Sequence, residues 1–221
     1  MFILHRVGRY VFYASLFSAV ISPSFAVAKC EMADSSVEKG LYGLALSYYE
    51  MCTAHNPDSQ DFYKLGSLYY KGLGLPHPDY SSASAFFKEA AERGHAPSMM
   101  FLGLMAMRGE GLEKPDYIEA YKWFMLAAER PENKWIYGFD TEDNPKAVDY
   151  LTNTGNSLTD ADKQKAAELA GFYKEKIIMR QAEKLFAPAA FDNFKADYAK
   201  DDKSRKKALD NLKEQMSLSR P

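Results

Sequence analysis

Apolar residues recur every three or four positions through the middle of the chain, a pattern that predicts amphipathic helices. The segment Asp61–Lys71 carries such a stripe and stops before Gly72. Glycine is favoured just beyond a helix because it adopts positive φ without strain. A second helix is predicted to start after Asp79, whose carboxylate can accept hydrogen bonds from the free amides of the first turn. The two elements together predict a helical hairpin.

This hairpin is repeated 37 positions later. Residues 65–93 and 102–130 align without a gap and are identical at 14 of 29 positions, mainly glycines, alanines and the capping aspartate. In the second copy Glu119 follows Asp116 by three positions, the spacing of a capping box. A fixed period of roughly 20 to 50 residues is typical of a solenoid, in which each unit buries its apolar face against its neighbours. The predicted fold class is therefore all-α, an α/α solenoid of helix-turn-helix repeats with a capping C-terminal helix.

Residue sizes predict how the two helices of a unit pack. Each second helix carries a large ring, Phe87 or Phe124, followed one turn later by paired alanines. Each first helix carries a glycine, Gly66 or Gly103, where we expect a neighbouring backbone to approach closely.

Weaker copies of the pattern flank the two complete units. Leu41–Thr53 matches a second helix at an offset of 38, and Asn133–Phe139 followed by Pro145–Asn153 is a degenerate third unit. A capping helix is predicted from Thr159, with Asp162 at capping-box spacing and a stripe of Ala166, Leu169, Tyr173 and Ile177. The predicted order is a signal peptide (1–28), an N-terminal half-repeat (29–60), two repeats (61–130), a degenerate repeat with the capping helix (131–186) and a charged helical or disordered tail (187–221).

The first 28 residues have the pattern of a secretory signal peptide. Arg6 and Arg9 precede an apolar run from Tyr10 to Ile21, and small residues end at Ala28, where a signal peptidase would cut. The apolar run is short for a transmembrane helix, and no later segment reaches the roughly 20 apolar residues that one needs. We therefore expect an exported protein, periplasmic or secreted, with a retained N-terminal anchor as the alternative.

The formal net charge of −2 makes the chain mildly acidic. Phosphate binding depends on clustered positive charge, so no nucleic-acid partner is expected. The sequence contains no P-loop, GxSxG, HExxH or zinc-type cysteine spacing, and neither a cofactor nor a metal is predicted.

Both cysteines, Cys30 and Cys52, lie near the start of the mature chain. A pair of thiols in an oxidising compartment usually becomes a disulfide, which we predict here. Such a bridge would close a loop of about 20 residues and contribute on the order of 3 kcal/mol through chain entropy. A redox-active pair lacks the C-x-x-C spacing, and a two-ligand metal site is the remaining alternative.

Residues Leu65 to Leu75 read Leu-Gly-x-x-Tyr-x-x-Gly-x-Gly-Leu, and an aspartate, an alanine, an aromatic pair and Ala-Ala follow in phase. This pattern resembles the Sel1-like repeat, a relative of the tetratricopeptide repeat, over residues 61–130. The resemblance implies a helical solenoid that binds other proteins. Family members with cysteines carry bridges between the helices of a unit, which supports the same pairing here.

In a stack of helical pairs the first helices line the concave side, where positions outside the structural motif can contact a partner. Tyrosine and methionine are common in recognition surfaces, although some of these side chains could instead pack against the adjacent unit. We predict a non-enzymatic adaptor that binds a protein or an extended peptide, with no catalytic residue. The candidate partner-binding residues are Tyr63, Ser67, Tyr70, Met100, Leu104 and Met107.

Two other functions deserve comparison. Some cysteine-rich relatives carry a weak penicillin-binding or β-lactamase label, and that chemistry needs a serine activated by a lysine. The Ser-x-x-Lys matches, Ser36 with Lys39 and Ser204 with Lys207, lie outside the repeats and lack the other elements of such a site. The third candidate function is that of a secreted factor that acts on a host protein.

Overall fold

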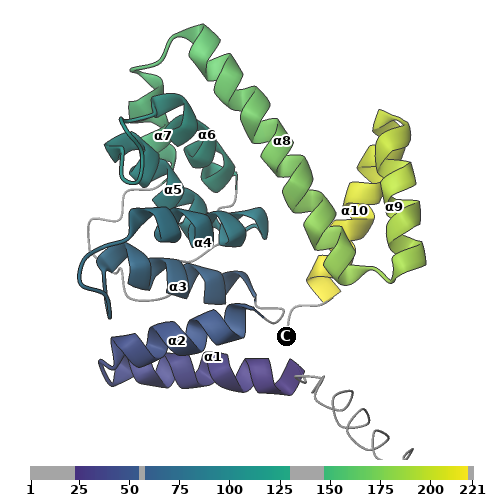
Figure 1. Ribbon diagram of the computed structural model, residues 1–221. Coiled ribbons are helices and arrows are strands. Elements are labelled where there is room, and N and C mark those ends of the chain that lie inside the picture. Colours follow the sequence, from purple (N-terminus) through teal and green to yellow (C-terminus); the bar gives the residue numbers. More distant parts are fainter. Residues whose placement is uncertain (1–22, 55–57, 130–146, 219–221) are drawn as a thin grey trace, which may run out of the picture.

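A computed structural model describes residues 23–54, 58–129 and 147–218, and these residues form ten α-helices and no strand. Helices α1 to α7 are stacked along one direction, and the long helix α8 slopes back beside them (Figure 1). None of the helices in the described ranges combines the length and apolar content needed to cross a membrane. Their bounds are α1 Pro23–Glu38, α2 Tyr42–Thr53, α3 Ser59–Lys71, α4 Tyr80–Glu92, α5 Ala96–Arg108, α6 Tyr117–Ala128, α7 Ala147–Gly155, α8 Asp160–Leu185, α9 Pro188–Lys200 and α10 Asp202–Leu218.

The pairs α1–α2, α3–α4 and α5–α6 pack as hairpins, and each pair contacts the next. We call α1, α3 and α5 the first helices and α2, α4 and α6 the second helices. The predicted all-α solenoid is confirmed. Helix α1 was not predicted as a helix; it begins at Pro23, so the predicted cleavage point after Ala28 lies within it, whereas residues 1–22 lie outside the described residues.

The predicted helix caps form in both repeats. Gly72 and Gly109 end α3 and α5 in the left-handed conformation, at φ values of 68° and 73°. The carboxylate of Asp79 accepts the amide of Ser82 at 3.0 Å, and that of Asp116 accepts the amide of Glu119 at 2.9 Å. The loop geometry of the two units is therefore set by the same chemistry at the same positions.

The second half of the predicted capping box at Asp116 is wrong. The carboxylate of Glu119 accepts the indole N–H of Trp123 at 2.9 Å and the ammonium of Lys122 at 2.5 Å. The Lys122 ammonium also lies 4.2 Å from the Trp123 ring and 4.3 Å from the Tyr173 ring of α8. Burial lowers the pKa of Lys122. Glu119 turns inward because a buried cation offers a stronger partner than an exposed amide does.

The two helices of each repeat meet through an aromatic ring that lies on a glycine. A Cβ atom at Gly66 would lie 2.8 Å from the ring of Phe87, and one at Gly103 would overlap the ring of Phe124. Both rings are completely buried. The close approach expected at these glycines is thus confirmed; the nearest neighbour is a ring, and at Gly66 the backbone carbonyl oxygen of Ala83 would also lie 3.3 Å from an added Cβ.

A cluster of aromatic side chains joins the first repeat to the second. The ring of Phe101 on α5 stacks on Phe87 of α4 with 5.0 Å between centroids, and it lies 6.0 Å from Tyr63 and 5.4 Å from Tyr70 on α3. Aromatic pairs at these separations contribute about 0.5–1.5 kcal/mol beyond the area that they bury. The repeats therefore share one apolar core instead of having one each.

Helix α8 starts at the predicted capping box, in which Thr159 and Asp162 accept each other's backbone amides. It covers α6, as an end cap would, and extends along the second helices as far as α4. Its buried residues are Ala166, Ala170, Ile177 and Ala182, whereas Leu169, predicted in the stripe, is exposed.

Ion pairs fix α8 at the ends of α4 and α6. Glu92 is 3% exposed and binds Lys176 at 2.7 Å and Arg180 at 3.2 Å. One repeat later, the equivalent Glu129 binds Lys174 at 2.7 Å. The repeat period thus places acidic groups where α8 supplies cations.

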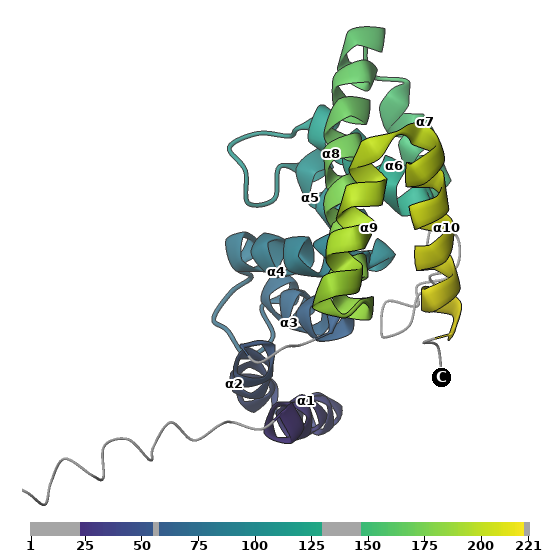
Figure 2. The ribbon, with the colours of Figure 1, turned by 90° about the vertical axis from the view of Figure 1, so that its right-hand side faces the viewer.

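The part of the predicted third unit from Asn133 to Phe139 lies outside the described residues, and α7 forms where its second helix was predicted. Beyond α8, the tail forms α9 and α10, which pack as a hairpin beside the end of α8 (Figure 2). A small separate core holds this hairpin, with Phe194, Tyr198 and Leu212 buried.

We expect Gly103→Ala to lower the free energy of unfolding by about 1–3 kcal/mol, because the added methyl group overlaps the buried ring of Phe124. Gly171→Ala is the matched control, since a Cβ at this helical position of α8 meets no atom within 4 Å. The control should raise the free energy of unfolding by about 0.5–1 kcal/mol. Urea denaturation followed by circular dichroism measures both, and equal effects would contradict the packing described.

Candidate interaction surface

A cavity of about 290 Å³ opens between the first helices α1 and α3. Its walls are apolar or aromatic, and its edges are charged. The size lies near the lower limit of small-molecule pockets, which suits one side chain of a bound peptide better than a cofactor. The lining residues are Asp34, Val37, Glu38, Tyr49, Tyr63, Lys64, Ser67, Leu68, Lys71 and Leu73.

One edge of this α1–α3 cavity is held by a polar contact between three helices. The ammonium of Lys64 on α3 lies 2.6 and 2.8 Å from the two carboxylate oxygens of Asp34 on α1. The hydroxyl of Tyr49 on α2 donates to the same carboxylate. Because the Asp34 side chain is 44% exposed, the pair contributes little net stability, and its main effect is to fix the spacing of the helices.

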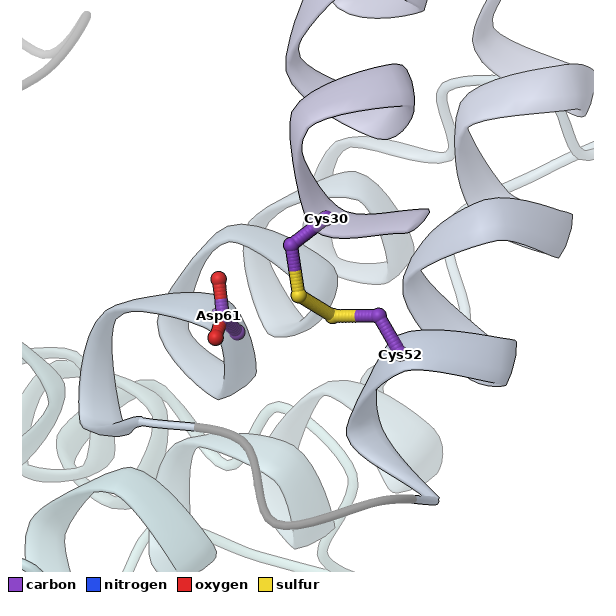
Figure 3. Close-up of side chains that lie close together, drawn as sticks. All are labelled: Cys30, Cys52 and Asp61. Atoms are coloured by element: carbon purple, nitrogen blue, oxygen red, sulfur yellow. A yellow bond between two sulfur atoms is a disulfide. The ribbon is translucent and has the colours of Figure 1, made fainter. Parts of the chain in front are cut away.

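Helix α1 is held in place by the predicted disulfide. Cys30 and Cys52 are bonded with 5.4 Å between their Cα atoms, and Cys52 is completely buried against α1 (Figure 3). Cys30, Ala33 and Val37 lie at helical spacing, a signal that could have predicted α1 and with it the cavity.

The carboxylate of Asp61 lies close to both sulfur atoms, as Figure 3 shows. Two sulfurs bonded to each other are not thiolates, and thiolates are what a metal binds. The Asp61 carboxylate instead accepts the backbone amide of Asp58 at 3.1 Å, which closes the capping box of α3. The arrangement is therefore a disulfide beside a helix start and does not have the chemistry of a metal site.

Of the six candidate partner-binding residues, the structure brings Tyr63 and Ser67 to the α1–α3 cavity. The Ser67 hydroxyl donates to the Tyr63 carbonyl oxygen at 2.8 Å, so it is already satisfied within α3. Leu104 and Met107 on α5 are half-buried against the core.

Two of the candidates are buried, and the hydroxyl of a third is hydrogen-bonded within the chain. Tyr63 is 3% exposed and Met100 is 2% exposed. The hydroxyl of Tyr70 donates to Glu110 at 3.0 Å and accepts from Arg108 at 3.1 Å, both beyond the boundary between the repeats. Burial is the main cause that raises the pKa of Tyr63 and of Tyr70 to about 12.

These side chains are buried because neighbouring first helices cover each other's flanks. Tyr63 and Tyr70 stand on the flank of α3 that faces α5, where they meet Phe101. The side of α3 that remains open carries Lys64 and Lys71. Sequence reasoning missed these lysines because it favoured residue types that are common in interfaces.

His95 lies behind the cavity wall and starts α5. Its Nδ1 accepts the Ser98 amide at 3.3 Å, its Nε2 is 3.0 Å from Gln60 Oε1, and its ring is 4.8 Å from the Tyr63 ring. Burial lowers the pKa of His95 to about 4. The neutral imidazole thus serves as the helix cap between the two repeats.

The serines considered for hydrolysis make local hydrogen bonds. The hydroxyl of Ser36 donates to the Met32 carbonyl at 2.7 Å within α1, and the side chain of Ser36 is buried. The hydroxyl of Ser204 donates to Asp201 at 3.1 Å at the start of α10.

The stacked helical pairs define a helical-repeat solenoid whose first-helix side is open. The Sel1 repeat model matches two consecutive segments of the chain, residues 63–95 and 96–131. These matches contain most of α3 and all of α4 to α6.

Two solved structures are similar to the chain. One is c5321, a protective antigen present in uropathogenic Escherichia coli strains that displays an SLR fold, with 22% identity and a TM-score of 0.56 over 73% of this chain and 33% of that one. The chain therefore spans about a third of that protein's length. The other is a Sel1 repeat protein from Oxalobacter formigenes, with 20% identity and a TM-score of 0.44 over 92% of this chain and 95% of that one. A search of curated proteins found no match.

We expect acid to destabilise the protein through His95. The pKa is about 4 when folded and 6.5 in the reference state, so between these values the unfolded chain binds a proton that the folded chain does not. The contribution is fully present above pH 6.5 and is lost as the pH falls towards 4, on the order of 3 kcal/mol. His95→Asn keeps a capping side chain and should flatten this part of the profile.

Urea denaturation at a series of pH values between 4 and 7 measures this effect. His77→Asn, a change at the exposed loop histidine, is the control and should reproduce the wild-type profile. If the free energy of unfolding of His95→Asn varied with pH as steeply as that of the wild type, the histidine would not be the cause of the pH dependence.

Proposed function

We propose that the protein is an exported, non-enzymatic adaptor that binds a partner protein or an extended peptide along its first-helix side. The α1–α3 cavity is the observation that carries this proposal, because it combines apolar walls with charged edges on the side that α8 leaves open. Sel1 repeats are in general scaffolds for protein–protein interaction, which supports the same role.

The cavity favours a peptide whose apolar side chain enters between Val37, Leu68 and Leu73. The cavity edge carries Lys71 on one wall and Glu38 on the other, and the Lys64–Asp34 pair lies between them, so its charges are of both signs. Leu104 and Met107 are half-buried on the next first helix and extend the proposed contact along the stack.

The Cys30–Cys52 bond supports export, because structural disulfides persist in oxidising compartments such as the periplasm. We expect the mature chain to begin at Lys29 and to be recovered from the periplasm. Cell fractionation followed by N-terminal mass analysis measures this. Recovery of a chain that starts at Met1 from the cytoplasm would contradict it.

The binding proposal is tested by filling the cavity. Ser67→Arg places a long side chain into it, whereas Ala85→Arg introduces the same side chain at an exposed position of the second helix α4. Cross-linked partners captured from the cell envelope by tagged protein are quantified by mass spectrometry. We expect Ser67→Arg to lose at least about tenfold of the recovered partner, equivalent to about 1.4 kcal/mol, and Ala85→Arg to retain it.

Thermal unfolding confirms that both variants are folded. Equal recovery with the two variants, or no partner with the wild-type protein, would contradict the proposal.

A further inference from the structure

The carboxylate of Asp61 lies beside the Cys30–Cys52 bond, with one oxygen within 4.8 Å of both sulfur atoms (Figure 3). Asp61 is in the first turn of α3, which packs against α2. Its side chain is partly buried, and burial, followed by the charge of Asp58, raises the pKa of Asp61. The capping box accounts for the hydrogen bond that this carboxylate accepts from the Asp58 amide, but an asparagine would supply the same acceptor. The negative charge next to the sulfur atoms is therefore a separate feature of the structure.

The charged groups around Asp61 are mainly acidic. Asp58 and Asp34 act on its carboxylate with negative charge, and Lys64 acts on it with positive charge. The Lys64 ammonium also binds the two carboxylate oxygens of Asp34, at 2.6 and 2.8 Å. Lys64 is thus shared between two carboxylates, and the surroundings of the disulfide disfavour a further negative charge.

Thiols would reduce this disulfide by attack on Cys30, which is partly exposed, because Cys52 is completely buried. The attacking thiolate forms a bond to Sγ of Cys30, the bond between the two Sγ atoms breaks, and its electron pair leaves on Sγ of Cys52. Negative charge therefore moves from the reductant to a buried position beside Asp61. Burial and a neighbouring like charge both disfavour a thiolate at that position, so this step should be slow.

We propose that the Asp61 carboxylate protects the Cys30–Cys52 disulfide from reduction by thiols. The protected bond holds α1 on α2, and α1 supplies Asp34, Val37 and Glu38 to the α1–α3 cavity. A charge at the start of α3 thus preserves the covalent link that keeps the opposite wall of the cavity in place. The inference concerns the reactivity of the bond and does not depend on the proposed function.

Reduction of the folded, oxidised protein by dithiothreitol at pH 8 and low ionic strength tests the proposal. The dithiol supplies two electrons and two protons and becomes a cyclic disulfide, and the protein gains two thiols. Alkylation of samples at successive times, followed by intact-mass analysis, gives the second-order rate constant. We expect Asp61→Asn, which keeps the capping acceptor and removes the charge, to be reduced at least about tenfold faster than the wild type.

Asp58→Asn is the matched control. It removes a carboxylate from the same turn, where Asp58 accepts the amides of Gln60 at 2.7 Å and Asp61 at 3.0 Å, and asparagine is an equally good helix cap. Asp58 is not among the side chains grouped with the two sulfur atoms, so its replacement should change the rate constant far less than Asp61→Asn does.

A second reductant separates the effect of charge from local opening of the fold. Tris(hydroxypropyl)phosphine is neutral; its attack creates a phosphonium cation together with the leaving thiolate, and water then converts the phosphonium to the phosphine oxide and releases the second thiol. Because a cation and an anion form together, Asp61→Asn should leave this rate nearly unchanged. Equal rates of dithiol reduction in wild type and Asp61→Asn, equal acceleration with both reductants, or a rate independent of dithiol concentration would overturn the proposal.

Discussion

An aromatic ring that lies on a glycine holds together the two helices of each repeat. Phe87 and Phe124 occupy the space that a side chain at Gly66 or Gly103 would need, and both rings are fully buried. Because a ring fits only where no Cβ is present, the pair fixes how closely the helices of a unit approach. Phe101 then stacks on Phe87 and carries the contact into the next unit. The stack therefore behaves as one core with a regular geometry.

This packing leaves the two sides of the stack with different chemistry. On the second helices, the repeat period places Glu92 and Glu129 where the cations of α8 can reach them. On the first helices, the flank that faces the next unit is buried, and the open side between α1 and α3 forms a cavity. The proposed binding surface is thus the part of the first helices that the stack leaves uncovered.

The sequence predicts the local features well because their causes are local. The turn glycines Gly72 and Gly109 and the cap at Asp79 follow from the chemistry of one loop, and the 37-residue period shows that they recur. The disulfide followed from there being only two cysteines. Contacts between side chains and between distant segments were harder to predict. Glu119 accepts from the buried Lys122 and does not complete the capping box, and α8 extends further along the stack than an end cap would.

The candidate binding residues were also difficult to predict, because their exposure depends on contacts between distant segments. Tyr63 and Met100 are residue types common in interfaces, yet the adjacent packing covers them, as their exposures of 3% and 2% show. Asp34 and Lys64 are separated by 30 positions and meet only because α1 is tied to α2. No periodicity in the sequence connects them, although the spacing of Cys30, Ala33 and Val37 indicates the helix that brings Asp34 there.

Native-state hydrogen exchange over a urea series tests most directly whether the repeats form one core. A shared core predicts that the slowest amides of α3, α4, α5 and α6 exchange through a single opening with one free energy and one urea dependence. Phe101→Ala should lower that free energy equally in both repeats. Separate openings for the two repeats, or a loss of protection confined to α5 in Phe101→Ala, would contradict it.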